Sequence, residues 1–339
     1  MQDNHRKQEY LSVTKQILKL NAVWVDPPSD LKRSDITSRL HDDVRLEFST
    51  TPTEKPNSHF DLLIAGKMTP DILQCFPTIK GVVMPFSGLP QDLRKTLLIA
   101  PERTLKVFSV DFHSVSVAEM AVTLLLAALR GLITADRKMR NGEWWKAKTA
   151  RQLNDLNILV LGLGKVGLRV AKLCNLLGMN INAVRRNSER NAPDYVHVSG
   201  PDCIHTHLQD ADAVVVCLPL TDRTRGLIGA EELRIMKSDA VLVNVGRAHV
   251  VQEWALFEAL KNDQIFGAAI DVWYEEEREL SMTDAAPFHE LDNVLMSPHR
   301  SWRMHGAEQK RAIAVADFLN RYAAGNITPD EEIDLASGY

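Results

Sequence analysis

The feature that most constrains the fold is a glycine-rich loop within residues 157–187. These residues read NILVLGLGKVGLRVAKLCNLLGMNINAVRRN. Gly162, Gly164 and Gly167 have the spacing G-x-G-x-x-G. The first glycine permits a tight turn, the second lets the backbone approach a pyrophosphate, and the third lets the helix pack on the strand. A strand precedes the glycines, and a second one ends about twenty residues later, as in a dinucleotide-binding βαβ unit. This context predicts a pyrophosphate site at the amino terminus of the helix.

Arg185 and Arg186 follow the second strand, at the position where a dinucleotide-binding fold that prefers NAD has an acidic residue. An acid at position 185 would accept hydrogen bonds from the adenosine ribose and would repel a 2′-phosphate. Arg185 reverses this preference because its planar guanidinium suits a phosphate. We therefore predict NADP as the preferred cofactor, with NAD as the alternative, and contacts from Arg185, Arg186 and Asn187. The other interpretation is that the arginines are solvated on a loop.

Strand-like and helix-like segments alternate along the chain in two sets. The first set has strand candidates at Ala22–Val25, Leu62–Ala65, Lys80–Met84 and Leu105–Val110. The second set has them at Ile158–Leu161, Ile181–Val184, Ala213–Cys217, Val241–Val245, Ala268–Ile270 and Val294–Met296. This alternation predicts an α/β protein with parallel sheets covered on both faces, and six strands suit a complete doubly wound domain.

Two helices connect these sets. Residues 113–145, HSVSVAEMAVTLLLAALRGLITADRKMRNGEWW, are expected to form one long buried helix. Its most apolar part contains Glu119 and Arg130 and is too short for a membrane span. A final helix at Gly306–Ala324 is expected to return to the first domain.

Composition and charge exclude several classes of protein. The 339 residues carry a formal net charge of -4, so no basic excess is available to neutralise nucleic-acid phosphates. The four cysteines are not at metal or redox spacing, and no metal is expected. The first residues, MQDNHRKQEYL, lack the apolar core of a signal peptide. We expect a cytoplasmic protein with neither a nucleic-acid nor a membrane partner.

Charged residues follow three consecutive strands of the second set. Arg247 follows the fourth strand, Asp271 and then Glu276 follow the fifth, and His299 follows the sixth. Because open α/β sheets bind ligands at the carboxyl ends of their strands, we expect these side chains to converge.

The sequence resembles the D-isomer-specific 2-hydroxyacid dehydrogenase family from about Ile79 to the final helix. The resemblance rests on VAEMAVTLLLAALRG, LGLGKVG, VVCLPLTDRTRGLI, LVNVGRAHVV, AAIDVW and MSPH, in the family's order. It implies a Rossmann domain, residues 116–302, inserted into a flavodoxin-like substrate-binding domain made of residues 1–115 and 303–339. It also implies a homodimer, because family members usually pair through the nucleotide domain.

The resemblance assigns catalytic roles to Arg247, Glu276 and His299. His299 would exchange the proton of the substrate hydroxyl, since imidazole titrates near neutral pH. Glu276 would orient the imidazole and favour its protonated form, while Arg247 would hold the substrate carboxylate and polarise the carbonyl. Asp271 would accept a hydrogen bond from the nicotinamide carboxamide, with a capping or salt-bridging role as the alternative.

The predicted cofactor site collects residues from several strand ends. It comprises Gly162, Leu163, Gly164, Lys165, Val166, Gly167, Arg185, Arg186, Asn187, Leu218, Pro219, Thr224, Val245, Gly246, Arg247, Asp271 and His299. The predicted substrate site comprises Ser87, Gly88, Arg247 and His299, because the loop MPFSGLPQDL matches one with which the family holds a carboxylate. Arg300, Trp302 and Arg303 would either narrow the pocket, bind an anionic group or pack between domains.

The resemblance implies hydride transfer between NAD(P)H and a small 2-oxo acid or D-2-hydroxy acid, as in glyoxylate and hydroxypyruvate reductases. One alternative is a dehydrogenase of a phosphorylated hydroxy acid, of the 3-phosphoglycerate type. Another is a non-catalytic, NAD(P)-sensing corepressor-like protein, which would bind cofactor but reduce 2-oxo acids poorly. A formate dehydrogenase is disfavoured, because that branch of the family has a glutamine at the position that Glu276 occupies here.

Overall fold

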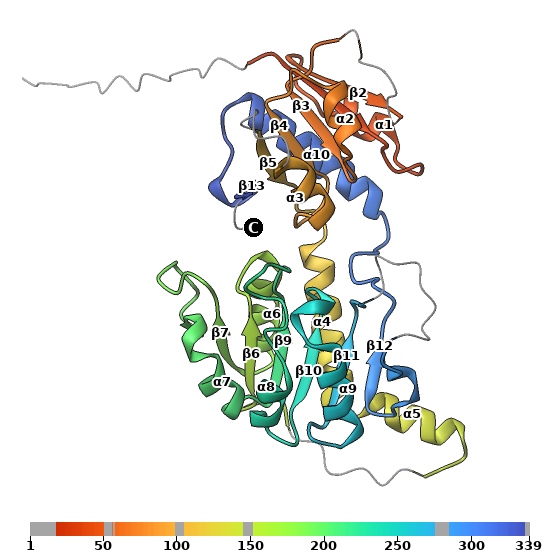
Figure 1. The fold of residues 1–339 in the computed structure, drawn as a ribbon, viewed down its shortest axis with the longest axis vertical. Coiled ribbons are helices and arrows are strands. Elements are labelled where there is room, and N and C mark those ends of the chain that lie inside the picture. The colour runs from red at the N-terminus through yellow and green to blue at the C-terminus, as the bar shows by residue number, and fades with distance from the viewer. Residues whose placement is uncertain are drawn as a thin grey trace, which may run out of the picture. The chain divides into compact units, whose positions relative to one another are not determined.

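The chain folds into two compact α/β units, which are described in a computed structural model for residues 18–50, 56, 58–98, 105–144, 152–274 and 285–335. Among the described residues, those up to Asp111 and those from Glu308 onward form the first unit, and those from Phe112 to Ala307 form the second. In Figure 1 the first unit therefore contains both the red-to-orange strands and the blue helix α10. The sequence analysis expected the boundaries at 115/116 and 302/303.

The first unit is built on a six-stranded sheet in the order β13-β5-β4-β3-β1-β2. Its strands are β1 (Leu20–Val25), β2 (Val44–Ser49), β3 (Leu62–Ala65), β4 (Gly81–Met84), β5 (Lys106–Ser109) and β13 (Glu332–Ile333). Its helices are α1 (Arg33–Thr37), α2 (Pro70–Cys75), α3 (Gln91–Leu98) and α10 (Ala307–Ala323). The strands are parallel except for β13, which pairs antiparallel with β5. This is the flavodoxin-like strand order with one added edge strand.

The second unit is built on a seven-stranded parallel sheet in the order β12-β11-β10-β9-β6-β7-β8. Its strands are β6 (Asn157–Leu161), β7 (Asn180–Val184), β8 (Val196–Ser199), β9 (Ala213–Val216), β10 (Val241–Asn244), β11 (Gly267–Ile270) and β12 (Val294–Met296). Its helices are α4 (Ser114–Leu129), α5 (Leu132–Arg140), α6 (Lys165–Leu176), α7 (Ile204–Asp210), α8 (Ala230–Ile235) and α9 (Glu253–Lys261). The order is that of the doubly wound dinucleotide fold with a seventh strand at the edge.

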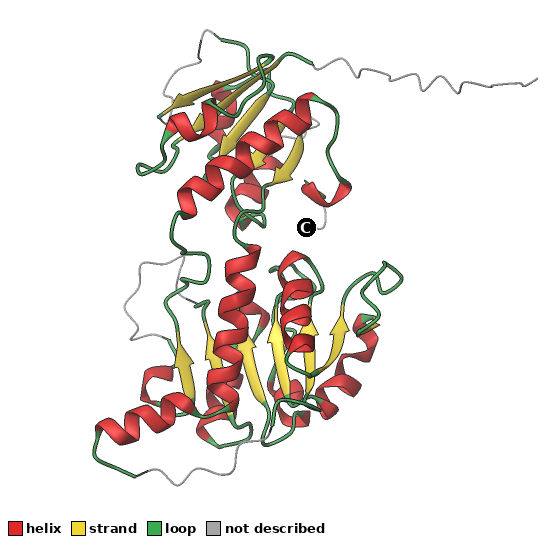
Figure 2. Cartoon of the chain, turned by 180° about the vertical axis from the view of Figure 1, so that it is seen from behind, coloured by secondary structure: helices red, strands yellow, loops and turns green. Residues whose placement is uncertain are grey.

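Each face of the second sheet packs on its own set of helices. Apolar residues of α4 and α6 fill one cluster, and those of α7, α8 and α9 fill the other. Figure 2 shows these helices as layers on either side of the yellow strands. The strands read as near-continuous apolar runs because both of their faces are buried.

The expected strands are confirmed, but three edge strands (β2, β8 and the two-residue β13) and a helix break were missed. β2 reads VRLEFS and β8 reads VHVS, and both alternate polar with apolar residues at a sheet edge. The single long helix is wrong: α4 and α5 are bent by 62°. Gly131 lies between them with φ +56, a left-handed conformation that glycine adopts easily. The expected final helix is confirmed as α10 to within one residue at each end.

Among the described residues, no single helix is long and apolar enough to cross a membrane, although the bent α4–α5 pair passes by length and composition alone. No group of three or more His, Cys, Asp or Glu side chains in the described ranges is arranged to hold a metal ion.

Candidate functional site

The glycine loop closes very tightly at the carboxyl end of β6. Gly162 has φ +96, and a Cβ at Gly167 would lie 2.0 Å from the carbonyl oxygen of Gly162. Helix α6 begins immediately, with Gly164 as its N-cap. The first amide N–H groups of α6 have no partner within the helix, so this turn is suited to an anion.

Arg185 is buried at the carboxyl end of β7, and its guanidinium is incompletely paired. The residue is 9% exposed, and its Nη1 donates to the Asn191 carbonyl at 3.5 Å. Among the described residues, neither Nε nor Nη2 of Arg185 has a hydrogen-bond partner. Burial, assisted by the positive charge of Arg190, lowers the pKa of Arg185. A buried cation with unpaired N–H groups is unfavourable unless an anion joins it. Arg186 and Asn187 are exposed.

Two further loops meet at the carboxyl ends of β9 and β10. A Cβ at Gly246 would lie 2.6 Å from the Leu218 carbonyl oxygen, so only glycine permits this approach. The Thr224 hydroxyl donates to the Pro219 carbonyl at 2.7 Å and accepts from the Thr221 amide at 2.8 Å. Thr224 therefore shapes the loop that begins at Leu218.

Arg247 is exposed after β10, and the buried side chain of Asn244 holds its backbone. Asn244 Nδ2 donates to the Arg247 carbonyl at 3.1 Å, while its Oδ1 accepts from the Gly246 amide at 3.1 Å. The Arg247 guanidinium also donates to the Gly246 carbonyl at 2.8 Å. The sequence analysis missed Asn244, whose signal is an amide at the end of an otherwise apolar strand.

His299 follows β12 in an uncommon backbone conformation. Its φ is +45, in the left-handed region, and its amide donates to the Ser297 carbonyl at 3.0 Å. The residue is half-buried. Because β10 and β12 flank β11, Arg247 and His299 lie at the carboxyl edge of one sheet, together with the glycine loop.

The structure favours a different role for Asp271 from the expected carboxamide contact. Asp271 is completely buried, and its Oδ1 accepts from the Ser297 hydroxyl at 2.5 Å and the Arg300 amide at 3.1 Å. Its Oδ2 accepts from the Ser301 amide at 3.0 Å. No exposed carboxylate oxygen remains for a carboxamide, so the capping role, which the sequence left as the alternative, fits the geometry.

The remaining predicted residues separate into three groups. Glu276 lies outside the described residues. Ser87 and Gly88 follow β4 of the first unit, where Gly88 has φ +94 and both residues are half-buried. Leu163 and Val245 are buried, Val166 is half-buried and Lys165 is exposed.

Trp302 packs against the apolar cluster that contains residues of α4 and α6. The Arg303 guanidinium lies 5.2 Å from the centre of the Trp302 ring. These contacts favour packing for both residues. The Arg300 side chain is exposed.

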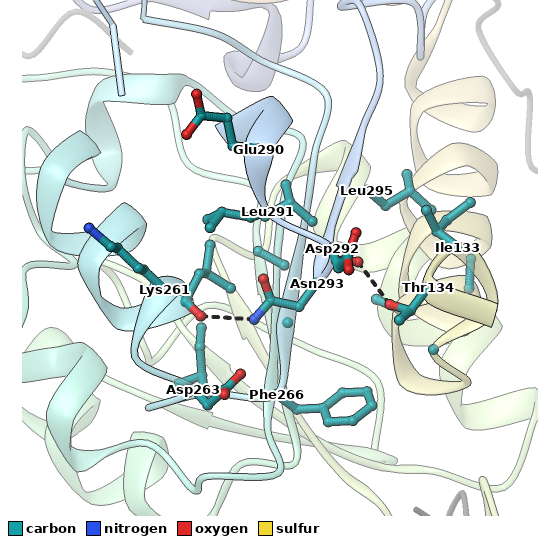
Figure 3. A pocket seen from close by; sticks show the side chains of 18 of the residues that line it. Ile133, Thr134, Lys261, Asp263, Phe266, Glu290, Leu291, Asp292, Asn293 and Leu295 are labelled. Atoms are coloured by element: carbon teal, nitrogen blue, oxygen red, sulfur yellow. Dashed lines mark hydrogen bonds between the residues drawn. The ribbon is translucent and has the colours of Figure 1, made fainter. Parts of the chain in front are cut away.

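A cavity of about 530 Å³ lies at the other end of the sheet. It is lined by Gly267 and Val294, which begin β11 and β12, and by Thr134 of α5. Beside the cavity, the Thr134 hydroxyl donates to the Asp292 carbonyl, and the Asn293 side-chain amide donates to the Leu260 carbonyl. Figure 3 shows Thr134, Asp292 and Asn293 in this part of the structure. This cavity is therefore distinct from the edge that carries Arg247 and His299.

Comparison with known proteins identifies the fold and the family. The model of the family described as D-isomer specific 2-hydroxyacid dehydrogenase, NAD binding domain, matches residues 122–301. A D-3-phosphoglycerate dehydrogenase of Methanocaldococcus jannaschii is 30% identical over 262 residues, which is 77% of this chain and 49% of that protein. A glyoxylate reductase of Aeropyrum pernix is 33% identical over 221 residues, which is 63% of this chain and 64% of that protein.

A solved structure shares the two-unit fold. It is a D-isomer specific 2-hydroxyacid dehydrogenase from Xanthobacter autotrophicus in complex with NADPH and MES. Its TM-score is 0.79 at 24% identity, with 95% of this chain and 100% of that chain covered. The chain spans about half to two thirds of the length of the two curated relatives above.

Proposed function

Because the chain belongs to the D-isomer-specific 2-hydroxyacid dehydrogenase family, we propose that it is an NAD(P)-dependent oxidoreductase that reduces a small 2-oxo acid to the D-2-hydroxy acid. The observation that carries this proposal is that the glycine loop, Arg247 and His299 all follow strands at the carboxyl edge of one parallel sheet. The second unit is the dinucleotide-binding domain, and the first unit is the substrate-binding domain.

The described residues fit a dinucleotide. Gly162 and Gly167 leave no room for side chains where a pyrophosphate would approach, and the amide groups at the start of α6 would donate to it. Gly246 permits the equally close contact of the β9 and β10 loops. When bound, the reduced nicotinamide supplies the hydride.

The residues of the chain supply charge and a proton. Arg247 binds the substrate carboxylate through its planar fork and polarises the carbonyl, which stabilises the negative charge that grows on the oxygen. The protonated imidazole of His299 gives its proton to that oxygen. Glu276, which lies outside the described residues, is proposed from the family resemblance to orient that imidazole. Ser87 and Gly88 are the residues that we propose for carboxylate binding on the first unit, since glycine lets a ligand approach the backbone.

NADP is the preferred cofactor in this proposal, and the buried Arg185 supports it. Its unpaired Nε and Nη2 provide donors for a 2′-phosphate, and a dianion would offset the cost of the buried positive charge. NADH would leave that cation without a counter-ion.

The proposal is tested with a panel of 2-oxo acids and both reduced cofactors. Glyoxylate, hydroxypyruvate, pyruvate and 3-phosphohydroxypyruvate are each incubated with the protein and NADPH or NADH, and loss of the reduced cofactor is followed. We expect turnover of a small 2-oxo acid and a higher kcat/KM with NADPH. Cofactor binding without turnover of any acid would instead favour the non-catalytic sensor.

A dehydrogenase of a phosphorylated hydroxy acid is the second candidate. It is favoured by the match to a phosphoglycerate dehydrogenase across 77% of this chain. In the same panel this candidate predicts that 3-phosphohydroxypyruvate has the highest kcat/KM.

A homodimer is also part of the proposal, and an exposed apolar surface on α5 supports it. Leu132 and Met139 are 58% and 53% exposed, and they lie about two turns apart on one side of the helix. Trp144, just beyond the helix, is 80% exposed. Sedimentation of the wild type and of Leu132→Asp would give dimer and monomer, respectively. A wild-type monomer at micromolar concentration would refute the pairing.

A further inference from the structure

The backbone of His299 has a conformation that a residue with a Cβ seldom adopts unless its surroundings enforce it. Its φ of +45 lies in the left-handed region, and the preceding residue is Pro298. This conformation sets the direction in which the Cα–Cβ bond leaves the chain. Whatever holds the left-handed turn therefore also aims the imidazole.

On the amino-terminal side of His299, hydrogen bonds fix the amide, the carbonyl and the hydroxyl of Ser297. The Ser297 amide donates to the Ile270 carbonyl at 2.8 Å, which continues the pairing of β12 with β11. The Ser297 carbonyl accepts from the Trp273 indole N–H at 2.8 Å. The Ser297 hydroxyl donates to Asp271 Oδ1 at 2.5 Å.

Contacts on the carboxyl side of His299 return to the same carboxylate. The Arg300 amide donates to Asp271 Oδ1 at 3.1 Å, and the Ser301 amide donates to Oδ2 at 3.0 Å. The Ser301 carbonyl accepts from the Ser116 hydroxyl of α4 at 2.7 Å. One buried side chain thus joins both flanks of the turn that carries His299.

We propose that Asp271 and Ser297 are positioning residues that clamp His299 in its left-handed backbone conformation and thereby aim its imidazole. We call Asp271, Ser297 and Trp273 the His299 clamp. The inference rests on the proposed function, because the aim of an imidazole matters only if His299 transfers the proton.

The chemistry of the clamp requires a carboxylate. Asp271 is completely buried, and its three donors among the described residues are a hydroxyl and two amides, which are neutral. A buried carboxylate is costly unless its lone pairs are satisfied, and three N–H or O–H donors satisfy most of them. An asparagine would present two N–H donors where the clamp needs an acceptor. An apolar residue would leave two amides and a hydroxyl unpaired.

The clamp is tested by removing the Ser297 hydroxyl and, as a control, a side-chain hydrogen bond near the other end of the same strand. Ser297→Ala deletes the bond to Asp271 and keeps the backbone, whereas Ser297→Thr retains a hydroxyl. Asn293→Ala is the matched control, since it deletes a half-buried side-chain bond to the Leu260 carbonyl just before β12, at the opposite end of that strand. For each variant, kcat, KM, the Kd of the cofactor and the solvent deuterium isotope effect on kcat are measured.

We expect Ser297→Ala to lower kcat at least tenfold, with the Kd of the cofactor within twofold of wild type. The solvent isotope effect should rise, because proton transfer from a misdirected imidazole becomes slower. Ser297→Thr should recover most of kcat, and Asn293→Ala should match the wild type. A kcat and isotope effect of Ser297→Ala that equal those of the wild type would overturn the clamp while leaving the reductase function intact.

Crystal structures of the wild type and of Ser297→Ala provide a readout that needs no turnover. We expect His299 to leave the left-handed region in the variant. If its φ stays near the wild-type value, the clamp is refuted. If the wild type reduces no 2-oxo acid, the proposed function fails and the inference fails with it. If the wild type is active and Ser297→Ala is equally active, only the inference fails.

Discussion

Arg321 and Glu331 form a two-pronged ion pair that ties helix α10 to the end of the first unit. Arg321 Nη1 donates to Glu331 Oε2 at 2.6 Å, and Nη2 donates to Oε1 at 2.5 Å. The Thr328 amide and hydroxyl donate to the same carboxylate. These donors lower the pKa of Glu331 to about 2, with the Arg321 hydrogen bond as the largest cause. The pair lies directly before β13, which extends the first sheet.

Glu331→Gln should destabilise the first unit by about 1–3 kcal/mol at neutral pH, since hydrogen bonds to charged groups are lost. The folded pKa is depressed, so the contribution is present above the unfolded value of 4.5 and is lost as the pH falls toward 2. Urea unfolding at pH 7 and pH 3 measures the difference, which should shrink at the lower pH. Glu332→Gln, in an exposed pair with Lys106, should change stability by less than about 1 kcal/mol. Equal effects of both variants would contradict the prediction.

Gly167→Ala should weaken cofactor binding at least tenfold. The added methyl would lie 2.0 Å from the Gly162 carbonyl oxygen, so either α6 or the loop must shift. Titration of the protein with NADPH measures the Kd. Gly200→Ala is the control, because among the described residues no atom outside its chain neighbours lies within 4 Å of the new Cβ. A Gly167→Ala protein with the wild-type Kd would show that this contact does not shape the site.

Arg185→Ala should lower kcat/KM with NADPH at least tenfold and leave the value with NADH within about threefold. The reason is that the variant loses donors to the 2′-phosphate, which NADH lacks. Arg186→Ala should have a smaller effect, since that side chain is exposed. Parallel losses with both cofactors would show that Arg185 is structural and does not choose between them.

Arg247→Lys should raise the KM for the 2-oxo acid and lower kcat, because lysine cannot present two parallel N–H donors to a carboxylate. The Kd of the cofactor should stay within about twofold. Steady-state kinetics and cofactor titration together distinguish substrate binding from cofactor binding. An unchanged KM and kcat would remove Arg247 from the proposed site.

Much of the second unit could be predicted from its sequence because its central strands are buried on both faces. Such strands appear as continuous apolar runs, and all six that were expected are present. Strand β8 was missed because only one side of VHVS meets the core. The break at Gly131 was missed because glycine inside an apolar stretch is also compatible with a continuous helix.

The positions of the candidate site residues after strands could be predicted from the sequence, but their contacts could not. Position after a strand indicated Arg247 and His299, because all parallel strands end at one edge of the sheet. Position alone does not reveal whether a side chain faces a ligand or its own backbone. Asp271 faces the backbone around His299, and Asn244 likewise supports Arg247. Such partners depend on tertiary contacts that strand patterns do not encode.

Helix α10 follows the second unit in the chain but packs in the first unit, and this order has a consequence for folding during translation. Phe318 and Leu319 of this helix complete the apolar cluster that also contains Trp24 and Leu62 from the beginning of the chain. During translation, the first five strands of that sheet emerge long before helix α10, which packs on them. The first unit therefore cannot complete this apolar cluster until the ribosome has synthesised the entire second unit.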